Sequence, residues 1–312
     1  MLKAVVNVLL AIVFSETAVI VPAVSSSPNV DVVGPAVRAS TQVLPRADQR
    51  GPAKINRESL GVVTDAPTVL VRDVRSGVAL VQQDAGVRRP IASITKLMTA
   101  IVLVEDYTWS STDAATVLRE DVRSGGRWYF RFSDEITMGD LFSVMLVASG
   151  NNETMALVRS VGASEDEFVA KMNAKAAALG MRDTSFADLI GLSAENTSTA
   201  QDVMVMMRRA LSHDEIAVRV HLPTVNVTSA LGYTYAIEGT NELLGSLLNQ
   251  SPYRIVGGKT GSTDEAGYCL ATRVAQGDVE LDIVVLGARQ PNGRFEDVKD
   301  IVSWAFDVYR WN

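Results

Sequence analysis

Ser93-Ile94-Thr95-Lys96 stands at the start of an apolar run that continues through residues 97–104. This pattern predicts a buried helix over residues 91–104 with Ser93 in its first turn. Residues three apart share one face of a helix, so the hydroxyl of Ser93 and the amine of Lys96 can meet. Serine becomes a nucleophile when a neighbouring base takes its proton. Lysine can be that base when burial or a nearby cation lowers its pKa.

Two further motifs follow the first one in order along the chain. Alone, an S-x-x-K spacing arises by chance about once in a chain of this length. Here it is followed by Ser149-Gly150-Asn151 and by Lys259-Thr260-Gly261. The ordered set S-x-x-K, S-x-N and K-T-G is that of penicillin-binding proteins and class A β-lactamases. The three motifs together therefore predict one active site for acyl transfer.

Longer stretches around these motifs restrict the resemblance to one family of serine peptidases. Residues 90–100, 180–186 and 258–270 resemble the serine D-alanyl-D-alanine carboxypeptidases, which are the low-molecular-weight penicillin-binding proteins. The similarity runs from about residue 66 to the C-terminus. It implies an α/β (α+β) fold of the β-lactamase and penicillin-binding-protein kind, with a five-stranded antiparallel sheet flanked by helices and the site at the junction with a helical subdomain.

The hydrophobic pattern by itself predicts the same architecture. Short apolar runs around a glycine-containing turn predict a hairpin near the start of the domain, and three further strands are expected near its end. The expected strands are 68–72, 78–82, 254–259, 267–274 and 279–286. Residues 105–215 are expected to be mostly helical, and an amphipathic pattern over 298–308 predicts a closing helix. The sheet is thus built from both ends of the domain, with a helical insertion after Val104.

Composition excludes several other classes of protein. The chain has 312 residues, 47% of them hydrophobic, and a net charge of −7 without a basic cluster. A nucleic-acid partner, which needs a cationic face, is therefore not expected. The two histidines lie in no zinc-peptidase motif, and we expect neither a metal nor another cofactor. The single cysteine, Cys269, excludes an intrachain disulfide and is expected as a buried strand residue.

The N-terminal residues are expected to direct export. Residues 1–24 have the charge, apolar stretch and small residues of a cleaved signal peptide, with an uncleaved membrane anchor as the alternative. Residues 25–60 are rich in proline and serine and are expected to be a flexible linker. The D,D-peptidase domain is expected to span residues 61–312. We expect a periplasmic or other extracytoplasmic location, with membrane contact only through an N-terminal anchor.

The chemistry of the motifs, together with the resemblance, assigns a role to each reacting group. Ser93 is expected to attack the carbonyl of a penultimate D-alanine, with Lys96 as base in acylation and deacylation. Ser149 is expected to bridge the two lysines and to protonate the leaving amine. Asn151 is expected to hold Lys96 and to bind a substrate amide. Lys259 is expected to be a fixed cation that keeps Lys96 neutral.

A second set of residues is expected to bind the substrate. Backbone N–H groups of Ser93 and Ser262 would form the oxyanion hole. A carboxypeptidase must also recognise a free carboxylate, for which Thr260, next to Gly261, and an arginine are suited. The resemblance implies Arg294 for this role, with Arg289 as its competitor. The partners implied are a peptidoglycan peptide ending in D-Ala-D-Ala and β-lactam inhibitors.

Some features depart from the family and leave alternatives open. Related enzymes often carry an arginine before an Asn-x-Leu-Leu segment, where this chain has Thr240. Many relatives also add a β-rich domain and a C-terminal membrane helix, and the length of this chain is closer to the endopeptidase branch. The alternatives are therefore a D,D-endopeptidase that cuts cross-links, a serine β-lactamase and a non-catalytic peptidoglycan-binding protein. The lactamase is disfavoured because no E-x-x-L-N segment supplies its glutamate.

Overall fold

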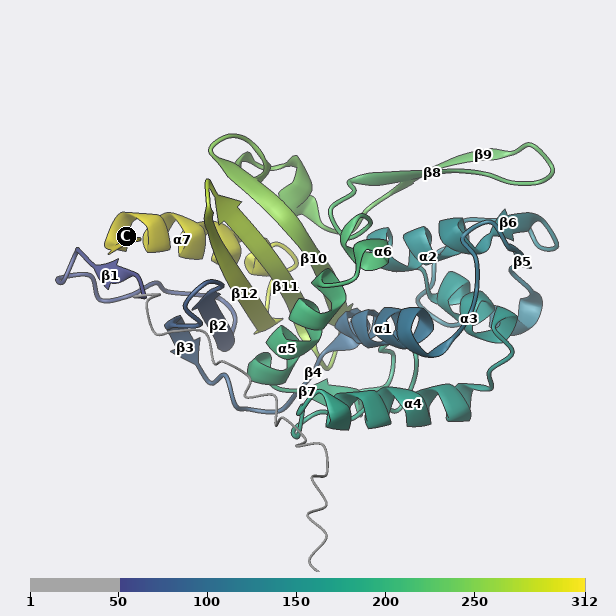
Figure 1. Cartoon of the computed structure of the whole chain (residues 1–312), viewed down its shortest axis with the longest axis horizontal. Coiled ribbons are helices and arrows are strands. Elements are labelled where there is room, and N and C mark those ends of the chain that lie inside the picture. Colours follow the sequence, from purple (N-terminus) through teal and green to yellow (C-terminus); the bar gives the residue numbers. More distant parts are fainter. Residues whose placement is uncertain (1–50, 312) are drawn as a thin grey trace, which may run out of the picture. The chain divides into compact units, whose positions relative to one another are not determined.

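A five-stranded antiparallel sheet organises residues 51–311, the part of the chain that the computed structural model describes (Figure 1). Its strand order is β10-β11-β12-β2-β3. The strands are β2 (Thr68–Asp73), β3 (Ala79–Gln83), β10 (Tyr253–Thr263), β11 (Gly267–Gln276) and β12 (Val279–Ala288). Two early strands and three late strands therefore form one sheet, which confirms the predicted architecture.

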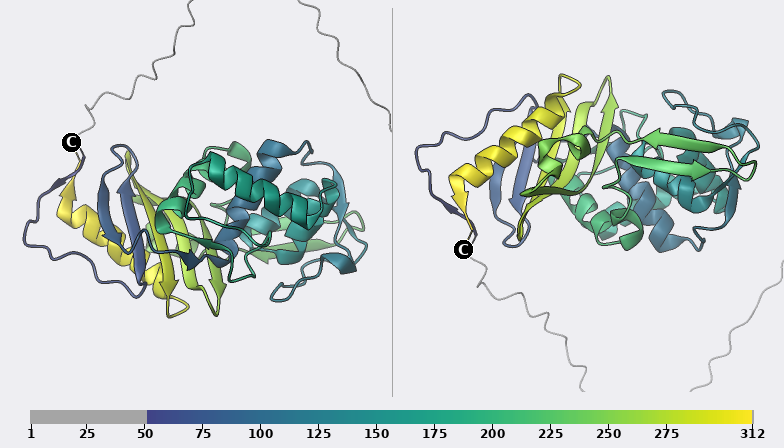
Figure 2. Two further views of the ribbon diagram at one scale, coloured as in Figure 1. Left: turned by 90° about the horizontal axis from the view of Figure 1, so that it is seen from below. Right: turned by 90° about the horizontal axis from the view of Figure 1, so that it is seen from above.

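The two faces of the sheet are covered by different helices. Along β2, Leu70 belongs to one apolar core, whereas Val69 and Val71 belong to a second core on the opposite face, because successive side chains of a strand point to opposite faces. The closing helix α7 (Gly293–Val308) packs on the second face, and α5 (Ala200–Leu211) packs on the first (Figure 2). The sheet is thus buried on both sides.

The helical region lies between β3 and β10 in sequence. It contains α1 (Lys96–Asp106), α2 (Met138–Val147), α3 (Asn151–Ser160), α4 (Glu165–Ala178), α5 and the short α6 (Asp214–Ala217). α1 begins after a 3₁₀ turn, η1 (Ala92–Thr95), so Ser93 precedes the α-helix and does not lie in its first turn. At the start of α2, the side chain of Thr137 accepts a hydrogen bond from the backbone N–H of Asp140 at 3.1 Å.

Residues 107–137 differ from the mostly helical expectation. They hold a two-stranded sheet of β5 (Ala114–Thr116) and β6 (Glu135–Thr137) and a 3₁₀ turn, η2 (Arg119–Asp121), and the rest is irregular. Glycine, serine and aspartate are frequent in this stretch and favour turns. A further hairpin, β8 (Thr224–Thr228) and β9 (Thr234–Glu238), extends along the helical region (Figure 1).

The N-terminal expectations fall partly outside the described residues. The expected signal peptide, residues 1–24, and most of the expected linker lie there. Residues 51–60, which are also expected to belong to the linker, instead contact the C-terminal part of the domain. β1 (Ala53–Lys54) pairs with β13 (Tyr309–Arg310), and Trp304 Nε1 donates to Ser59 Oγ at 2.9 Å. A strand of only two residues is too short to show a periodic pattern of hydrophobic residues, so the sequence composition could not reveal this contact.

Two further observations bear on the sequence analysis. Cys269 is fully buried in β11, as predicted, and burial raises the pKa of its thiol to about 11. Within residues 51–311, no helix has both the length and the hydropathy of a membrane span.

Candidate active site

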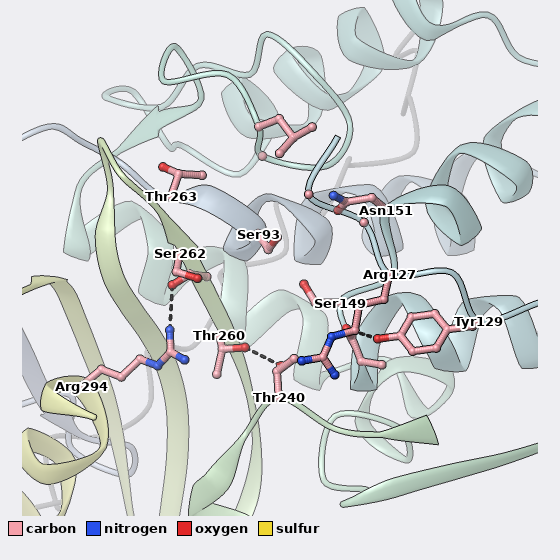
Figure 3. Close-up of a pocket in the computed structure, with 17 residues that line it drawn as sticks. Ser93, Arg127, Tyr129, Ser149, Asn151, Thr240, Thr260, Ser262, Thr263 and Arg294 are labelled. Carbon is pink, nitrogen blue, oxygen red and sulfur yellow. Dashed lines mark hydrogen bonds between the residues drawn. The ribbon is translucent and has the colours of Figure 1, made fainter. Parts of the chain in front are cut away.

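A cavity of about 300 Å³ lies where the end of β10 meets the helical region (Figure 3). The predicted residues that line it come from all three motifs and from α7: Ser93, Ser149, Asn151, Thr260, Gly261, Ser262 and Arg294. The predicted lysines, Lys96 and Lys259, are buried behind this lining. Residues far apart in sequence therefore converge on one pocket.

The backbone around Ser93 is enclosed by two glycines. A Cβ atom at Gly191 would lie 2.0 Å from the carbonyl oxygen of Ala92, and Gly191 has a φ of +86°. A Cβ atom at Gly261 would lie 3.0 Å from the backbone nitrogen of Ser93. Only glycine permits such close approach of two backbones at both positions. β10 therefore runs directly past the backbone N–H of Ser93, the predicted oxyanion donor.

Lys96 contacts Ser93 from within the core. Its Nζ lies 3.0 Å from Ser93 Oγ, 2.8 Å from Asn151 Oδ1 and 2.7 Å from the carbonyl oxygen of Ile190. In the ammonium form these three contacts use all three N–H donors. In the neutral form two of them remain donors, and the lone pair of the amine accepts from Ser93. The contact between Ser93 and Lys96 is the one that the three-residue spacing predicts.

The environment of Lys96 favours the neutral amine. Burial lowers its pKa from 10.5 to about 7, although the carboxylates of Asp188 and Glu153 oppose the shift. Burial disfavours a charged group because water no longer solvates it. Near neutral pH a large fraction of Lys96 is therefore free to accept a proton from Ser93.

The Ser149 turn joins α2 to α3 and points its hydroxyl at the second lysine. Ser149 has a φ of +61°, which is uncommon for a residue with a side chain. Lys259 Nζ donates to Ser149 Oγ at 2.8 Å and to the carbonyl oxygen of Thr260 at 2.9 Å. The structure differs from the predicted bridge, because Ser149 pairs with Lys259 while the three hydrogen bonds of Lys96 are made elsewhere.

The burial of Lys259 opposes the fixed positive charge that we expect for it. We expected a fixed cation that suppresses the pKa of Lys96. Burial instead lowers the pKa of Lys259 well below its usual 10.5, and the charges of Lys96 and Arg294 lower it further. Burial is also the main cause of the low pKa of Lys96. The two amines are therefore coupled, and protonation of one opposes protonation of the other.

Asn151 links the pocket to the loop before α2. Its Oδ1 accepts from Lys96, and its Nδ2 donates to the carbonyl oxygen of Ser124 at 3.2 Å. An amide group has two N–H donors. One of them thus fixes the side chain, and the other is available for a substrate carbonyl.

The structure distinguishes the two candidate arginines. Arg294 lines the pocket, donates from Nη1 to the carbonyl oxygen of Gly261 at 3.0 Å, and lies over the Phe295 ring at 4.7 Å. Its buried Nε has no acceptor among the described residues. Arg289 lies outside this pocket, with Nε 3.4 Å from Asp65 Oδ1. Arg294 therefore lines the pocket and has further N–H groups that could bind a substrate.

Several residues of the site escaped the motif search. Arg127 and Tyr129 line the pocket from the irregular stretch before β6, and Thr240 lines it with its hydroxyl 2.5 Å from that of Thr260. The sequence marked Thr240 as a departure from the family, but it gave Arg127 and Tyr129 no distinguishing signal. The carbonyl of Ile190 was missed because a backbone group has no sequence signature.

The position of that carbonyl depends on Asp188. Its carboxylate accepts the backbone N–H groups of Ile190 at 2.8 Å, Gly191 at 2.5 Å and Ser193 at 2.6 Å. These bonds hold a tight turn whose carbonyl oxygen faces Lys96. A carboxylate that accepts several backbone N–H groups is a rigid anchor.

Glu153 is a buried carboxyl group next to Gly150, in the turn that joins α2 to α3. Burial raises its pKa from 4.5 to about 7, and its Oε2 has no partner among the described residues. The folded state therefore binds the proton more tightly than the unfolded state. The associated stability is fully present below pH 4.5 and is lost as the pH rises to about 7 and beyond.

We predict that Glu153→Gln stabilises the protein at pH 8 by up to about 3 kcal/mol and has no such effect near pH 4. It should also move the midpoint of the kcat/KM profile to lower pH, because the charge of Glu153 raises the pKa of Lys96. Urea unfolding and pH–rate profiles check the two effects. The exposed Glu238→Gln is the control, and a pH-independent change in stability would contradict the assignment.

The comparisons with known proteins agree with this geometry. Residues 56–290 match the family described as D-alanyl-D-alanine carboxypeptidase. The D-alanyl-D-alanine carboxypeptidase DacF of Bacillus subtilis is 27% identical over 250 residues, which cover 78% of this chain and 63% of the relative. The D-alanyl-D-alanine endopeptidase of Pseudomonas aeruginosa is 30% identical over 239 residues, 76% of each chain.

A solved structure shows the same fold. Penicillin-Binding Protein D2 of Listeria monocytogenes, in its ampicillin-bound form, has a TM-score of 0.66 and 32% identity, and covers 78% of this chain and 98% of its own. The chain spans less than two thirds of the B. subtilis relative, at 63%. The family match nevertheless contains all three motifs and most of the described domain, and the chain belongs to the D-alanyl-D-alanine carboxypeptidase family.

Proposed function

We propose that this protein is a serine-type D-alanyl-D-alanine carboxypeptidase that acts on peptidoglycan stem peptides through an acyl-enzyme on Ser93. The observation that carries the proposal is the 3.0 Å contact between Ser93 Oγ and Lys96 Nζ, an amine whose pKa is about 7. This pair opens into a pocket lined by two arginines and by no carboxylate among the described residues. Such a pocket suits an anionic peptide end.

Acylation begins when neutral Lys96 accepts the proton of Ser93 Oγ. The oxygen attacks the carbonyl carbon of the penultimate D-alanine, and the backbone N–H groups of Ser93 and Ser262 stabilise the oxyanion. Losing one such donor typically costs about 10²–10³ in rate. Ser149, hydrogen-bonded to Lys259, passes a proton to the leaving amine as the C–N bond breaks. The proton that Lys96 took from Ser93 replaces the one that Ser149 gave up, so Lys96 is neutral again. D-alanine then leaves.

Deacylation uses Lys96 as the base again, and the proton transfers to and from Ser93 run in the opposite direction. Water replaces the departed D-alanine, Lys96 takes its proton, and the hydroxide attacks the ester carbon. The ester bond to Ser93 breaks, and Ser93 recovers its proton from Lys96. This scheme needs no glutamate in the pocket. The absence of carboxylates from the described lining favours a peptidase over a β-lactamase, because the class A β-lactamases use a glutamate for fast deacylation.

Substrate binding follows from the donors around β10. Arg294 presents N–H groups beside Gly261, and the hydroxyl of Thr260 lies at the same wall. Guanidinium and hydroxyl donors suit the free carboxylate of a C-terminal D-alanine. Asn151 and the exposed edge of β10 are suited to bind the peptide amides on the acyl side.

A second candidate activity is D,D-endopeptidase cleavage of peptidoglycan cross-links. The P. aeruginosa relative that this chain matches over 76% of its length is named an endopeptidase. Both reactions would use the same serine and the same acyl-enzyme, and they differ in the leaving group.

β-Lactams are proposed inhibitors, since the L. monocytogenes relative was solved with ampicillin. Peptidoglycan lies outside the cytoplasmic membrane, so we place the activity there, after export by the N-terminal residues.

Mass spectrometry of digested muropeptides tests the proposal. We expect pentapeptide monomers to lose their terminal D-alanine, and pretreatment with a penicillin to prevent this. Cross-linked dimers converted to monomers at a comparable rate would assign the endopeptidase activity instead. If the folded protein changed neither substrate and formed no penicillin adduct, the acyl-enzyme proposal would be wrong.

A further inference from the structure

Arg127 is a cation of the pocket that none of the three motifs supplies. It lies in the irregular stretch between η2 and β6 and lines the pocket together with Tyr129. Figure 3 shows its guanidinium pointing into the pocket on the side of Ser149 and Thr240, away from Arg294 and Ser262. The pocket therefore has an arginine on each of two walls.

Arg127 lies beside Tyr129 on the Ser149 wall of the pocket. Its guanidinium is next to the hydroxyl of Tyr129 (Figure 3). The Tyr129 hydroxyl in turn lies 3.5 Å from the carbonyl oxygen of Ala148, the residue before Ser149. The guanidinium is thus held next to the serine that we propose as the proton donor to the leaving amine.

The other arginines of this stretch already have partners. Arg123 pairs with Glu165, and the guanidinium of Arg131 lies 3.9 Å from the centre of the Tyr233 ring. Arg127 has no carboxylate within ion-pair distance in the described part of the chain, and no described carboxylate lines the pocket. Its five N–H donors exceed what one tyrosine hydroxyl can accept. An anionic group entering the pocket would find these donors free.

The chemistry of the leaving group identifies that anion. In a terminal D-alanine, a single carbon atom separates the amine from the carboxylate. An amine that receives its proton from Ser149 therefore carries its carboxylate into the same part of the pocket. The hydroxyls of Thr240 and Thr260, 2.5 Å apart, are neutral donors there. We propose that Arg127 binds the C-terminal carboxylate of the substrate from the Ser149 side, opposite Arg294. This inference rests on the proposed carboxypeptidase function.

A pair of matched substrates tests the proposal. An N-acyl-D-alanyl thioglycolate thioester has a carboxylate one carbon from the leaving sulfur, and its methyl ester lacks the charge. For Arg127→Gln we expect kcat/KM for the acid to fall about 10- to 100-fold, the range for a hydrogen bond to a charged group. The loss should appear mainly as a higher KM, because the carboxylate is bound in the ground state as well. Hydrolysis of the methyl ester should be unchanged.

Two further variants separate binding from structural support. Arg127→Lys should recover part of the activity on the acid, since an ammonium keeps the charge but not the bidentate fork. Arg131→Gln, in the same stretch but outside the pocket, should leave both substrates unaffected. An equal fall on both substrates, or no fall on either, would overturn the inference while the parent remained active. A parent that hydrolysed neither thioester would instead refute the proposed function.

Discussion

Replacing Ser93 with alanine is expected to lower kcat/KM for D-alanine release by at least about 10⁴-fold. Removal of a nucleophilic serine leaves only the oxyanion donors and substrate binding, and losses of about 10⁶ are known for such sites. The hydroxyl of Ser93 is the one that Lys96 contacts at 3.0 Å in the pocket. D-Alanine release from a pentapeptide measures the loss, and mass spectrometry should detect no penicillin adduct.

The matched control is Ser303→Ala, on the exposed side of α7. It should retain full activity and form the adduct. Urea unfolding should show that Ser93→Ala remains folded, since it removes only two hydrogen bonds, each worth about 1 kcal/mol. A Ser93→Ala protein that still released D-alanine, or still carried the adduct, would show that another group is the nucleophile.

The second large effect is expected at Lys96. Lys96→Arg keeps a cation but removes the base, because a guanidinium is not deprotonated in proteins. We expect kcat/KM to fall about 10²- to 10⁴-fold, the usual contribution of a general base. A larger side chain in a fully buried site also adds strain, so folding must be checked by circular dichroism. Lys299→Arg, on the surface of α7, is the matched control.

The pH profile gives a second measure of the same role. The base is active as the neutral amine, and the pKa of Lys96 is about 7. The kcat/KM of the parent should therefore be low in acid, rise through pH 7 and level off above it. Lys96→Arg should lack this rise. A parent profile that is flat between pH 6 and 8 would contradict Lys96 as the base.

Local patterns were enough to predict the five strands of the main sheet and the closing helix, in their order. The apolar runs around a glycine-containing turn predicted β2 and β3, and the amphipathic pattern over residues 298–308 predicted α7. The contact between Ser93 and Lys96 needed only a spacing of three residues, which a 3₁₀ turn followed by a helix satisfies as well as a single helix. Residues 107–137 were mispredicted because their structure depends on long-range contacts and not on a local period.

The charge state of the site could not be predicted in the same way. The motif order brought Lys259 to the site but did not show that it is as buried as Lys96. Burial is a property of everything packed around a group, and it is the main cause of both low pKa values. The sequence therefore predicted one fixed cation and one neutral base, but not that burial lowers the pKa of both amines.

By itself, the amino-acid sequence determined which groups could react, because serine, lysine and asparagine at these spacings carry the chemistry in their side chains. It also determined the strands and helices, whose periods are local. The folded chain alone decided which backbone carbonyl faces Lys96, that Ser149 pairs with Lys259, and that Arg127 enters the pocket opposite Arg294. These are relations between distant segments, and they exist only once the sheet and the helical region have packed together.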